Sequence, residues 1–310
     1  MLLNGGTLTG GSIVLAGTAG GSGSEGLAIY TSLAGGSITS NFTTSGFSAR
    51  PNLATFGPGL LTLGGNVAGG LTINSGSVRI AGTISGAISL FGDATLSGTG
   101  RSTSAVGGGH VSPGNSAGIL TASSAQSSVT STHSLGASFN GLPSFTAYAF
   151  EFTSLGAPTF NLPGASGNDL LRLTHPTTPF VSALTSDNEI ALYFNLAAGV
   201  HLGDSFLGGF FTDSNAPFDG SILGATWRVF LADPFGDTTF NGIKYSASPN
   251  GVLVSTVPQT ADFGAGNVNG YVAKVTIVPE PGAGALLTGA AGLLSLARLR
   301  LRQPAAIVRS

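Results

Sequence analysis

Short runs in which apolar and hydroxyl side chains alternate recur through residues 1–100, and most of them end in glycine. Residues 71–76 (LTINSG) and 77–82 (SVRIAG) are two such runs in direct succession. Alternation at a period of two directs one set of side chains to each face of a strand. Glycine accepts positive φ at the corners because it has no Cβ. Strands this short bury too little apolar surface alone, so we expect them to stack as coils of a degenerate β-helix.

The composition fits turn-rich β structure better than collagen or disorder. Glycine supplies 50 of the 310 residues, but the chain has no G-x-y period, which excludes a collagen triple helix. Apolar residues make up 42% of the chain, too many for a disordered polypeptide. Charged residues make up only 8%, so the clustered cations that bind nucleic acid are missing. Cysteine is absent, which excludes disulfides and cysteine-based metal or redox sites.

Aromatic residues divide the chain near residues 101–125. Only five of them precede that stretch, and the other 20 lie between Phe139 and Tyr271. Aromatic and β-branched residues favour strands. We therefore predict a second, aromatic-rich β section, which either caps the solenoid or packs as a sandwich. Its strand candidates are residues 147–152, 190–196, 226–231 and 271–277.

The C-terminal part of the chain combines a proline-rich motif, an apolar run and a basic end. Residues 278–281 (VPEP) precede residues 282–297, which carry no charged side chain. A helix over this run spans about 24 Å, and a few more residues reach the roughly 30 Å of a bilayer core if the following arginines extend to the interface. A buried helix of the β domain is the alternative, and it fits poorly with the basic residues that follow. These are Arg298, Arg300 and Arg302.

The order of these features resembles the PEP-CTERM sorting signal, over residues 278–302. The resemblance implies that an exosortase-type membrane protease recognises and processes the signal. It also implies a Gram-negative host that makes extracellular polysaccharide. The recognition motif is then Val278, Pro279, Glu280 and Pro281, and the cytoplasmic stop is Arg298, Arg300 and Arg302. These residues are features of a protease substrate and not catalytic groups.

A second resemblance covers residues 5–122. Residues 60–63, 71–76 and 112–121 are similar to the autotransporter-associated β-strand repeat, which implies a right-handed parallel β-helix. Residues 167–171 (GNDLL), which come after the strand candidate at residues 147–152, are similar to segments that follow such repeats in PEP-CTERM proteins.

The predicted fold class is all-β: a right-handed parallel β-helix-like solenoid followed by an aromatic-rich β section, plus one C-terminal transmembrane helix. The predicted segments are 1–124 (degenerate β-helix repeats), 125–277 (aromatic-rich β section), 278–302 (sorting and anchor segment) and 303–310 (cytoplasmic tail). Residues 1–6 contain no basic n-region and no apolar h-region. We therefore expect the true start, with a signal peptide, to lie upstream.

Three patterns match ligand or catalytic motifs but lack the expected context. Residues 114–118 match G-x-S-x-G, with Ser116 as nucleophile. We predict a turn at residues 112–114 and a strand at residues 119–122, whereas a nucleophile elbow needs a helix there. Residues 21–26 match the dinucleotide fingerprint, again without a following helix. The histidines are too dispersed for us to expect a metal site; they are His110, His133, His175 and His201.

We expect an exported, surface-anchored structural or matrix-associated protein without catalytic activity or cofactor. Its expected partners are an exosortase-type protease, the membrane and extracellular polysaccharide. One alternative is an adhesin or carbohydrate binder that uses exposed Trp227, Phe210 and Phe211, although core packing of such rings is favoured. A lesser alternative is a β-helix polysaccharide lyase or hydrolase. It needs converging carboxylates such as Glu151 and Asp169, which more often lie on a solvated face.

Overall fold

The structure is a computed structural model that describes the chain in segments. The described residues are 1–16, 26–45, 52–92, 94–114, 118–126, 146–155, 167–175, 180–181, 189–196, 201, 203–214, 226–240, 243–247 and 252–278. They form strands joined by turns, and no helix occurs among them. The described part of the chain is therefore all-β, as predicted.

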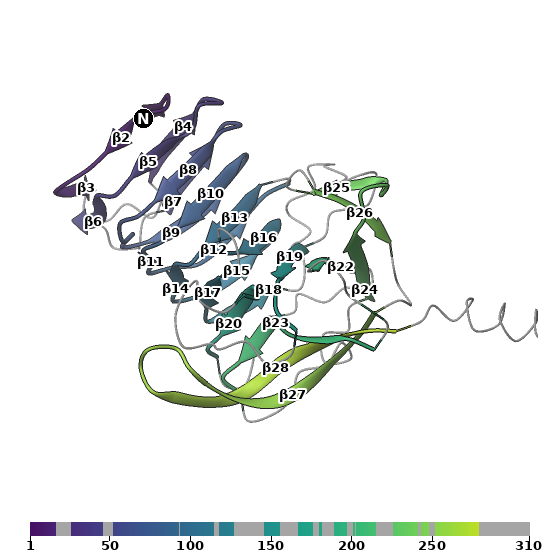
Figure 1. The fold of residues 1–310 in the computed structure, drawn as a ribbon. Coiled ribbons are helices and arrows are strands. Elements are labelled where there is room, and N and C mark those ends of the chain that lie inside the picture. Colours follow the sequence, from purple (N-terminus) through teal and green to yellow (C-terminus); the bar gives the residue numbers. More distant parts are fainter. Residues whose placement is uncertain are drawn as a thin grey trace, which may run out of the picture.

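The strands wind into a β-helix-like stack whose sheets are parallel for most of their length. Successive strands of one coil belong to different sheets, and equivalent strands of consecutive coils lie side by side (Figure 1). Val78 of strand β10 (Ser77–Ile80), for example, lies opposite Leu61 of the preceding coil and Leu96 of the following coil. The prediction of a β-helix-like fold is confirmed at this level.

The described strands belong to three main sheets, A, B and C, and to one separate pair. In spatial order, sheet A contains β1 (Leu2–Leu3), β4 (Leu27–Thr31), β7 (Asn52–Phe56), β9 (Gly70–Ile73), β12 (Ile88–Leu90), β15 (Ala105–Gly107), β18 (Ser124–Gln126) and β21 (Phe180–Val181). Sheet B contains β2 (Thr7–Leu8), β5 (Gly36–Ile38), β8 (Leu60–Leu63), β10, β13 (Thr95–Gly98), β16 (His110–Pro113), β19 (Thr146–Phe152), β22 (Glu189–Leu196), β24 (Thr226–Ala232), β26 (Ile243–Ala247) and β25 (Thr238–Phe240). Sheet C contains β11 (Thr83–Ile84), β14 (Arg101–Ser102), β17 (Ile119–Ala122), β20 (Leu170–Leu173), β23 (Ser205–Thr212), β28 (Asn267–Ile277) and β27 (Val252–Asp262). The separate pair is β3 (Ser12–Ala16) and β6 (Asn41–Ser45).

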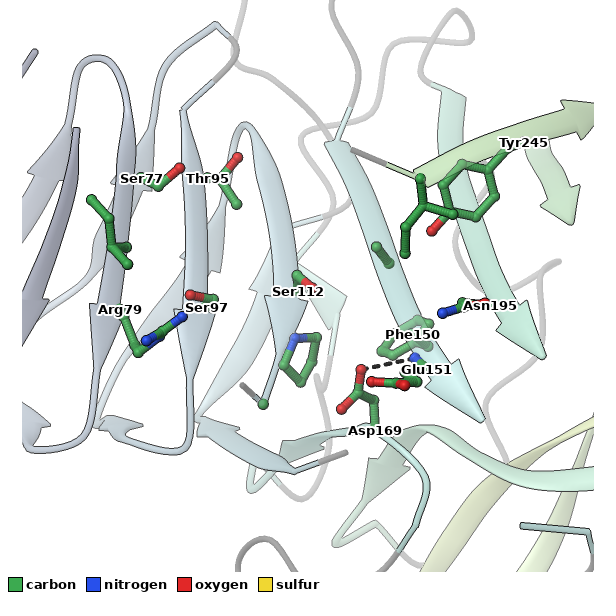
Figure 2. Close-up of a pocket in the computed structure, with 15 residues that line it drawn as sticks. Ser77, Arg79, Thr95, Ser97, Ser112, Phe150, Glu151, Asp169, Asn195 and Tyr245 are labelled. Carbon is green, nitrogen blue, oxygen red and sulfur yellow. Dashed lines mark hydrogen bonds between the residues drawn. The ribbon is translucent and has the colours of Figure 1, made fainter. Parts of the chain in front are cut away.

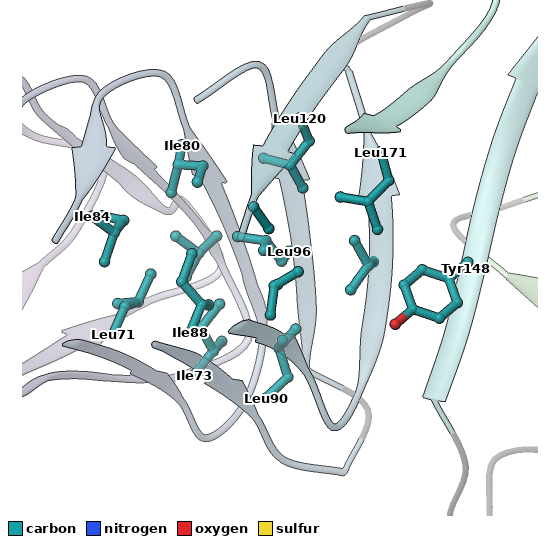
Figure 3. Packing of buried hydrophobic residues seen from close by; sticks show 14 of the residues in the cluster. Leu71, Ile73, Ile80, Ile84, Ile88, Leu90, Leu96, Leu120, Tyr148 and Leu171 are labelled. Atoms are coloured by element: carbon teal, nitrogen blue, oxygen red, sulfur yellow. The ribbon is translucent and has the colours of Figure 1, made fainter. Parts of the chain in front are cut away.

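Alternate side chains of each strand form a continuous apolar column inside the coils. In β10, Val78 and Ile80 are buried, whereas Arg79 between them lies on the outer face. Leu71 and Ile73 of β9 repeat the inward pattern, and these aliphatic side chains stack from coil to coil (Figure 3). Each coil therefore covers the apolar surface that its neighbour cannot bury alone.

Gly98 shows why the corners between strands need glycine. Its φ is +107°, and an added Cβ would lie 2.1 Å from the carbonyl oxygen of Ile80 in the preceding coil. Gly57 has the same φ of +107° and the same conflict with the carbonyl oxygen of Thr31, at 2.0 Å. Only a residue without a side chain allows the coils to approach this closely.

The three sheets run without interruption across residues 124 and 125, where the aromatic content rises. Strands β18, β19 and β20 pair in parallel with β15, β16 and β17, respectively. Phe150 and Phe152 of β19 belong to the same buried cluster as the aliphatic column, together with Phe194 of β22 and Phe210 of β23. The aromatic residues thus enlarge the existing core as the coils continue.

Antiparallel strands cover the C-terminal part of the stack. Strand β26 pairs with β24 and β25, and β28 pairs with β23 and β27. The long β27–β28 hairpin curves along the lower edge of Figure 1, and Phe263 at its tip packs against Phe211 of sheet C. The Arg172 guanidinium lies 4.0 Å from the centre of the Phe263 ring and forms an ion pair with Asp213. This contact fastens the hairpin tip to sheet C.

Candidate functional site

Of the predicted sorting motif, only Val278 lies in the described part of the chain. It follows directly after β28, the last strand that the structure describes. The predicted membrane helix at residues 282–297 lies outside the described residues. No helix among the described residues is long and apolar enough to cross a membrane. The other predicted site residues also lie outside them: Pro279, Glu280, Pro281, Arg298, Arg300 and Arg302.

The G-x-S-x-G motif is only partly described, and Ser116 lies outside the described residues. The predicted turn at residues 112–114 is wrong, because β16 continues through Pro113. Cross-strand pairing of β16 ends at Ser112, so proline occupies a position where the ladder needs no N–H. The predicted strand at residues 119–122 is confirmed as β17. Of the fingerprint match at residues 21–26, only Gly26 is described.

The described histidines come from three separate segments of the chain. His110 is buried in β16, and His175 follows β20. His201 is exposed, with Nδ1 3.7 Å from a carboxylate oxygen of Asp204. His133 lies outside the described residues. Within the described segments, no three His, Cys, Asp or Glu side chains gather as metal ligands.

Two of the three aromatic side chains of the adhesin alternative are described, and neither is available on the surface. Phe210 is 2% exposed and packs edge-on against Tyr148 and Phe150, with ring centroids 5.1 Å apart in both pairs. Phe211 is fully buried beneath Phe263. Core packing is therefore confirmed for both phenylalanines. Trp227 lies in β24, and its side chain is outside the described part.

A cavity of about 470 Å³ lies on the outer face of sheet B. The strand register places Arg79 beside Ser97, and Ser97 beside Ser112, so one row of polar side chains crosses three coils. Glu151 of β19 and Tyr245 of β26 line the other end of the cavity (Figure 2). The alternation that buries apolar residues inside the coils thus directs a polar row to this face.

Glu151 and Asp169 meet at one end of this cavity. The amide N–H of Glu151 donates to Asp169 Oδ2 at 2.8 Å, and the amide of Gly118 donates to Asp169 Oδ1 at 2.9 Å. The backbone N–H of Asp169 donates in return to the carbonyl oxygen of Glu151 at 2.8 Å. Asp169 is only 3% exposed, so the expectation of a solvated carboxylate is wrong for this residue. Backbone pairing between neighbouring coils supplies the polar partners that make its burial tolerable.

Burial shifts the protonation of two groups in the cavity. It raises the pKa of Asp169 to about 8, with a smaller contribution from the Glu151 carboxylate, while the two backbone hydrogen bonds oppose the shift. Burial, together with Glu151 and Asp169, raises the pKa of Tyr245 to about 12. At neutral pH, Asp169 and Tyr245 therefore keep their protons.

We expect Asp169 to make the stability of the protein depend on pH. Its pKa rises from 3.8 to about 8 on folding, so between these values the folded chain holds a proton that the unfolded chain releases. The contribution of this bound proton to the free energy of unfolding is complete below pH 3.8 and is lost as the pH rises through about 8. The free energy of unfolding should fall by up to about 1.4 kcal/mol per pH unit in this window.

Denaturant unfolding across this pH window measures the slope. The Asp169→Asn variant cannot ionise at this position, so the slope of its unfolding free energy against pH should be flatter. The Asp262→Asn variant, changed at the tip of the β27–β28 hairpin, should keep the slope of the unchanged protein. An unchanged slope in the Asp169→Asn variant contradicts this assignment.

The cavity combines groups suited to recognition of a polar ligand. Arg79 supplies hydrogen-bond donors, Glu151 supplies acceptors, and Ser97 and Ser112 supply hydroxyl groups that act as both. Sequence reasoning identified the two acids as candidates but missed Arg79, the serines, Asn195 and Tyr245. The available signal was the alternation within each strand, which predicts that Arg79 faces away from the aliphatic column.

Comparison of the chain with protein-family models and with curated proteins finds no match.

Proposed function

We propose that this chain is an exported structural protein, displayed at the surface of a Gram-negative bacterium and processed through its C-terminal sorting signal. The observation that carries the proposal is the position of the VPEP motif. The last described β-strand ends at Ile277, and the motif begins at the next residue. Among the described residues, the β part thus ends where the signal begins, which supports recognition of the signal by a membrane protease.

The β-helix-like stack supports a scaffold role. Each coil mainly contacts its neighbours, so such a stack forms an elongated body. With charged residues at only 8%, hydroxyl and amide groups provide much of its polar surface. We propose a right-handed winding for the stack, an aromatic-rich section as its C-terminal part and a transmembrane helix at residues 282–297. We further propose that the displayed protein associates with cell-surface polysaccharide.

Deletion of residues 279–302 from the gene in its own host should release the protein from the membrane and surface fraction. A second variant carries Pro279→Ala, Glu280→Gln and Pro281→Ala and keeps the apolar run. It should stay in the membrane at its unprocessed mass, because the anchor remains while the recognition motif is lost. Fractionation followed by immunoblotting measures location, mass and abundance together.

Phe235→Ala, at an exposed residue outside residues 279–302, is the matched control and should leave location and mass unchanged. If the deletion leaves the protein in the same fraction, at the same mass and abundance, the sorting proposal fails.

A further inference from the structure

Among the described residues that line the sheet B cavity, Arg79 is the one cation, and no described carboxylate forms an ion pair with it. Its Nε atom is buried, and no described residue accepts a hydrogen bond from it. Its cross-strand neighbours are Thr62 and Ser97, which carry hydroxyl groups. A buried donor left without an acceptor costs about 1–3 kcal/mol. A guanidinium fork matches a carboxylate through two parallel hydrogen bonds, so this end of the cavity is suited to an anionic group.

Hydroxyl groups line the floor between Arg79 and Glu151. Ser97 and Ser112 continue the row that begins at Arg79, and Figure 2 shows both beside the open space. From β10 to β19 there are three strand spacings, or about 14 Å. A ligand that reaches from one end to the other is therefore elongated and offers hydroxyl groups along its length. Saccharide chains have this chemistry.

The opposite end of the cavity fixes the orientation of such a ligand. Glu151 accepts hydrogen bonds from hydroxyl groups and repels a second carboxylate. Asn195 lies opposite Glu151 on β22 and adds an amide donor and acceptor. The Tyr245 side chain contributes an apolar ring on the neighbouring wall. Positive charge thus stands at one end and negative charge at the other.

We propose that the outer face of sheet B binds an acidic saccharide, with a sugar carboxylate held by Arg79 and neutral hydroxyl groups extending past the serines to Glu151. At this site the protein would contact an acidic polysaccharide. The site rests on the proposed function only for the presence of polysaccharide at the cell surface.

Isothermal titration calorimetry of the full chain tests the site with three probes of equal length. They are a trisaccharide with one terminal glucuronic acid, its methyl ester and the neutral parent trisaccharide. The acid should bind at least tenfold more tightly than the ester and the neutral sugar, because only the acid offers a carboxylate to Arg79. Equal binding of all three, or no binding of any, overturns the proposal.

Variants separate charge recognition from damage to the fold. Arg79→Gln should lower the affinity for the acid at least tenfold. Arg79→Lys should lower it less, because lysine keeps the positive charge but lacks the paired donors of the guanidinium. Glu151→Gln should change it by less than about twofold, because a charge about 14 Å from the sugar carboxylate is largely screened. Arg101→Gln, at the exposed residue of β14 in sheet C, is the matched control and should change nothing.

If the Arg79→Gln variant keeps its melting temperature and its affinity for the acid, the assignment is wrong. The assay contains neither membrane nor protease. Its failure therefore leaves the sorting proposal standing, and failure of the fractionation experiment leaves this site standing.

Discussion

The Phe150→Ala variant should lower the free energy of unfolding by about 3–5 kcal/mol. Phe150 is 2% exposed and lies at the centre of the aromatic part of the core. Its ring centroid is 5.1 Å from that of Phe210 and 6.1 Å from that of Phe194. Tyr148 and Phe152 flank it at 6.4 Å in both cases. Truncation leaves a cavity among rigid rings on three strands. These rings cannot fill the cavity by small movements.

Chemical denaturation with a linear extrapolation measures this loss, and Phe235→Ala is the matched control. Phe235 is 93% exposed, so its removal should change the free energy of unfolding by less than about 0.5 kcal/mol. Because coils contact mainly their neighbours, amide exchange in the Phe150→Ala variant should increase first in β19 and β22 and last in β8. Equal losses in the two variants would mean that the aromatic stack does not carry stability.

The individual strands of the coils could be predicted from the sequence because their signal is local. Residues 77–82 predicted a strand closed by glycine, and β10 occupies Ser77–Ile80. Residues 190–196 predicted a longer strand, and β22 occupies Glu189–Leu196. Period-two alternation and glycine corners are properties of a few adjacent residues. They therefore show in a single sequence.

The covering hairpins could not be predicted in the same way. Pro258 argues against a strand at residues 252–262, because proline cannot donate a hydrogen bond to a ladder. Strand β27 nevertheless includes it, since β27 is the edge strand of sheet C and needs partners on one side only. An edge position is a property of the whole sheet, so no local pattern reveals it.

For a related reason, single residues of the cavity could be predicted from the sequence, but not their convergence at one site. Asp169 accepts a hydrogen bond from Gly118, which lies 51 positions away, and another from Glu151, 18 positions away. Arg79 reaches the same cavity from a strand several coils earlier. The residues converge because in-register stacking repeats each position from coil to coil, and the length of the intervening loops does not affect that register. Stacking order therefore has to be known before the site can be assembled.

Replacement of Asn168 by leucine should destabilise the protein about as strongly as loss of Phe150, although no large apolar group is removed. Asn168 is fully buried next to Asp169. Its Oδ1 accepts from the amides of Thr153 and Ser154 at 3.0 and 2.9 Å. Its Nδ2 donates to the carbonyl oxygens of Ser154 and Leu207 at 3.0 and 2.9 Å. One side chain thus joins the end of β19 to β23.

Asn168→Leu preserves the volume of the side chain and removes all four of these hydrogen bonds. Because the backbone groups stay buried, we expect a loss of about 3–5 kcal/mol in the free energy of unfolding, measured by denaturation. Asn66→Ala is the matched control: Asn66 is exposed and accepts from the Thr83 amide, so its loss should be about 1 kcal/mol. Asn168→Asp keeps the acceptors and should recover stability at low pH, when its protonated carboxyl regains a donor. If Asn168→Leu is no more harmful than Asn66→Ala, water replaces the lost partners, and this corner does not hold the coils together.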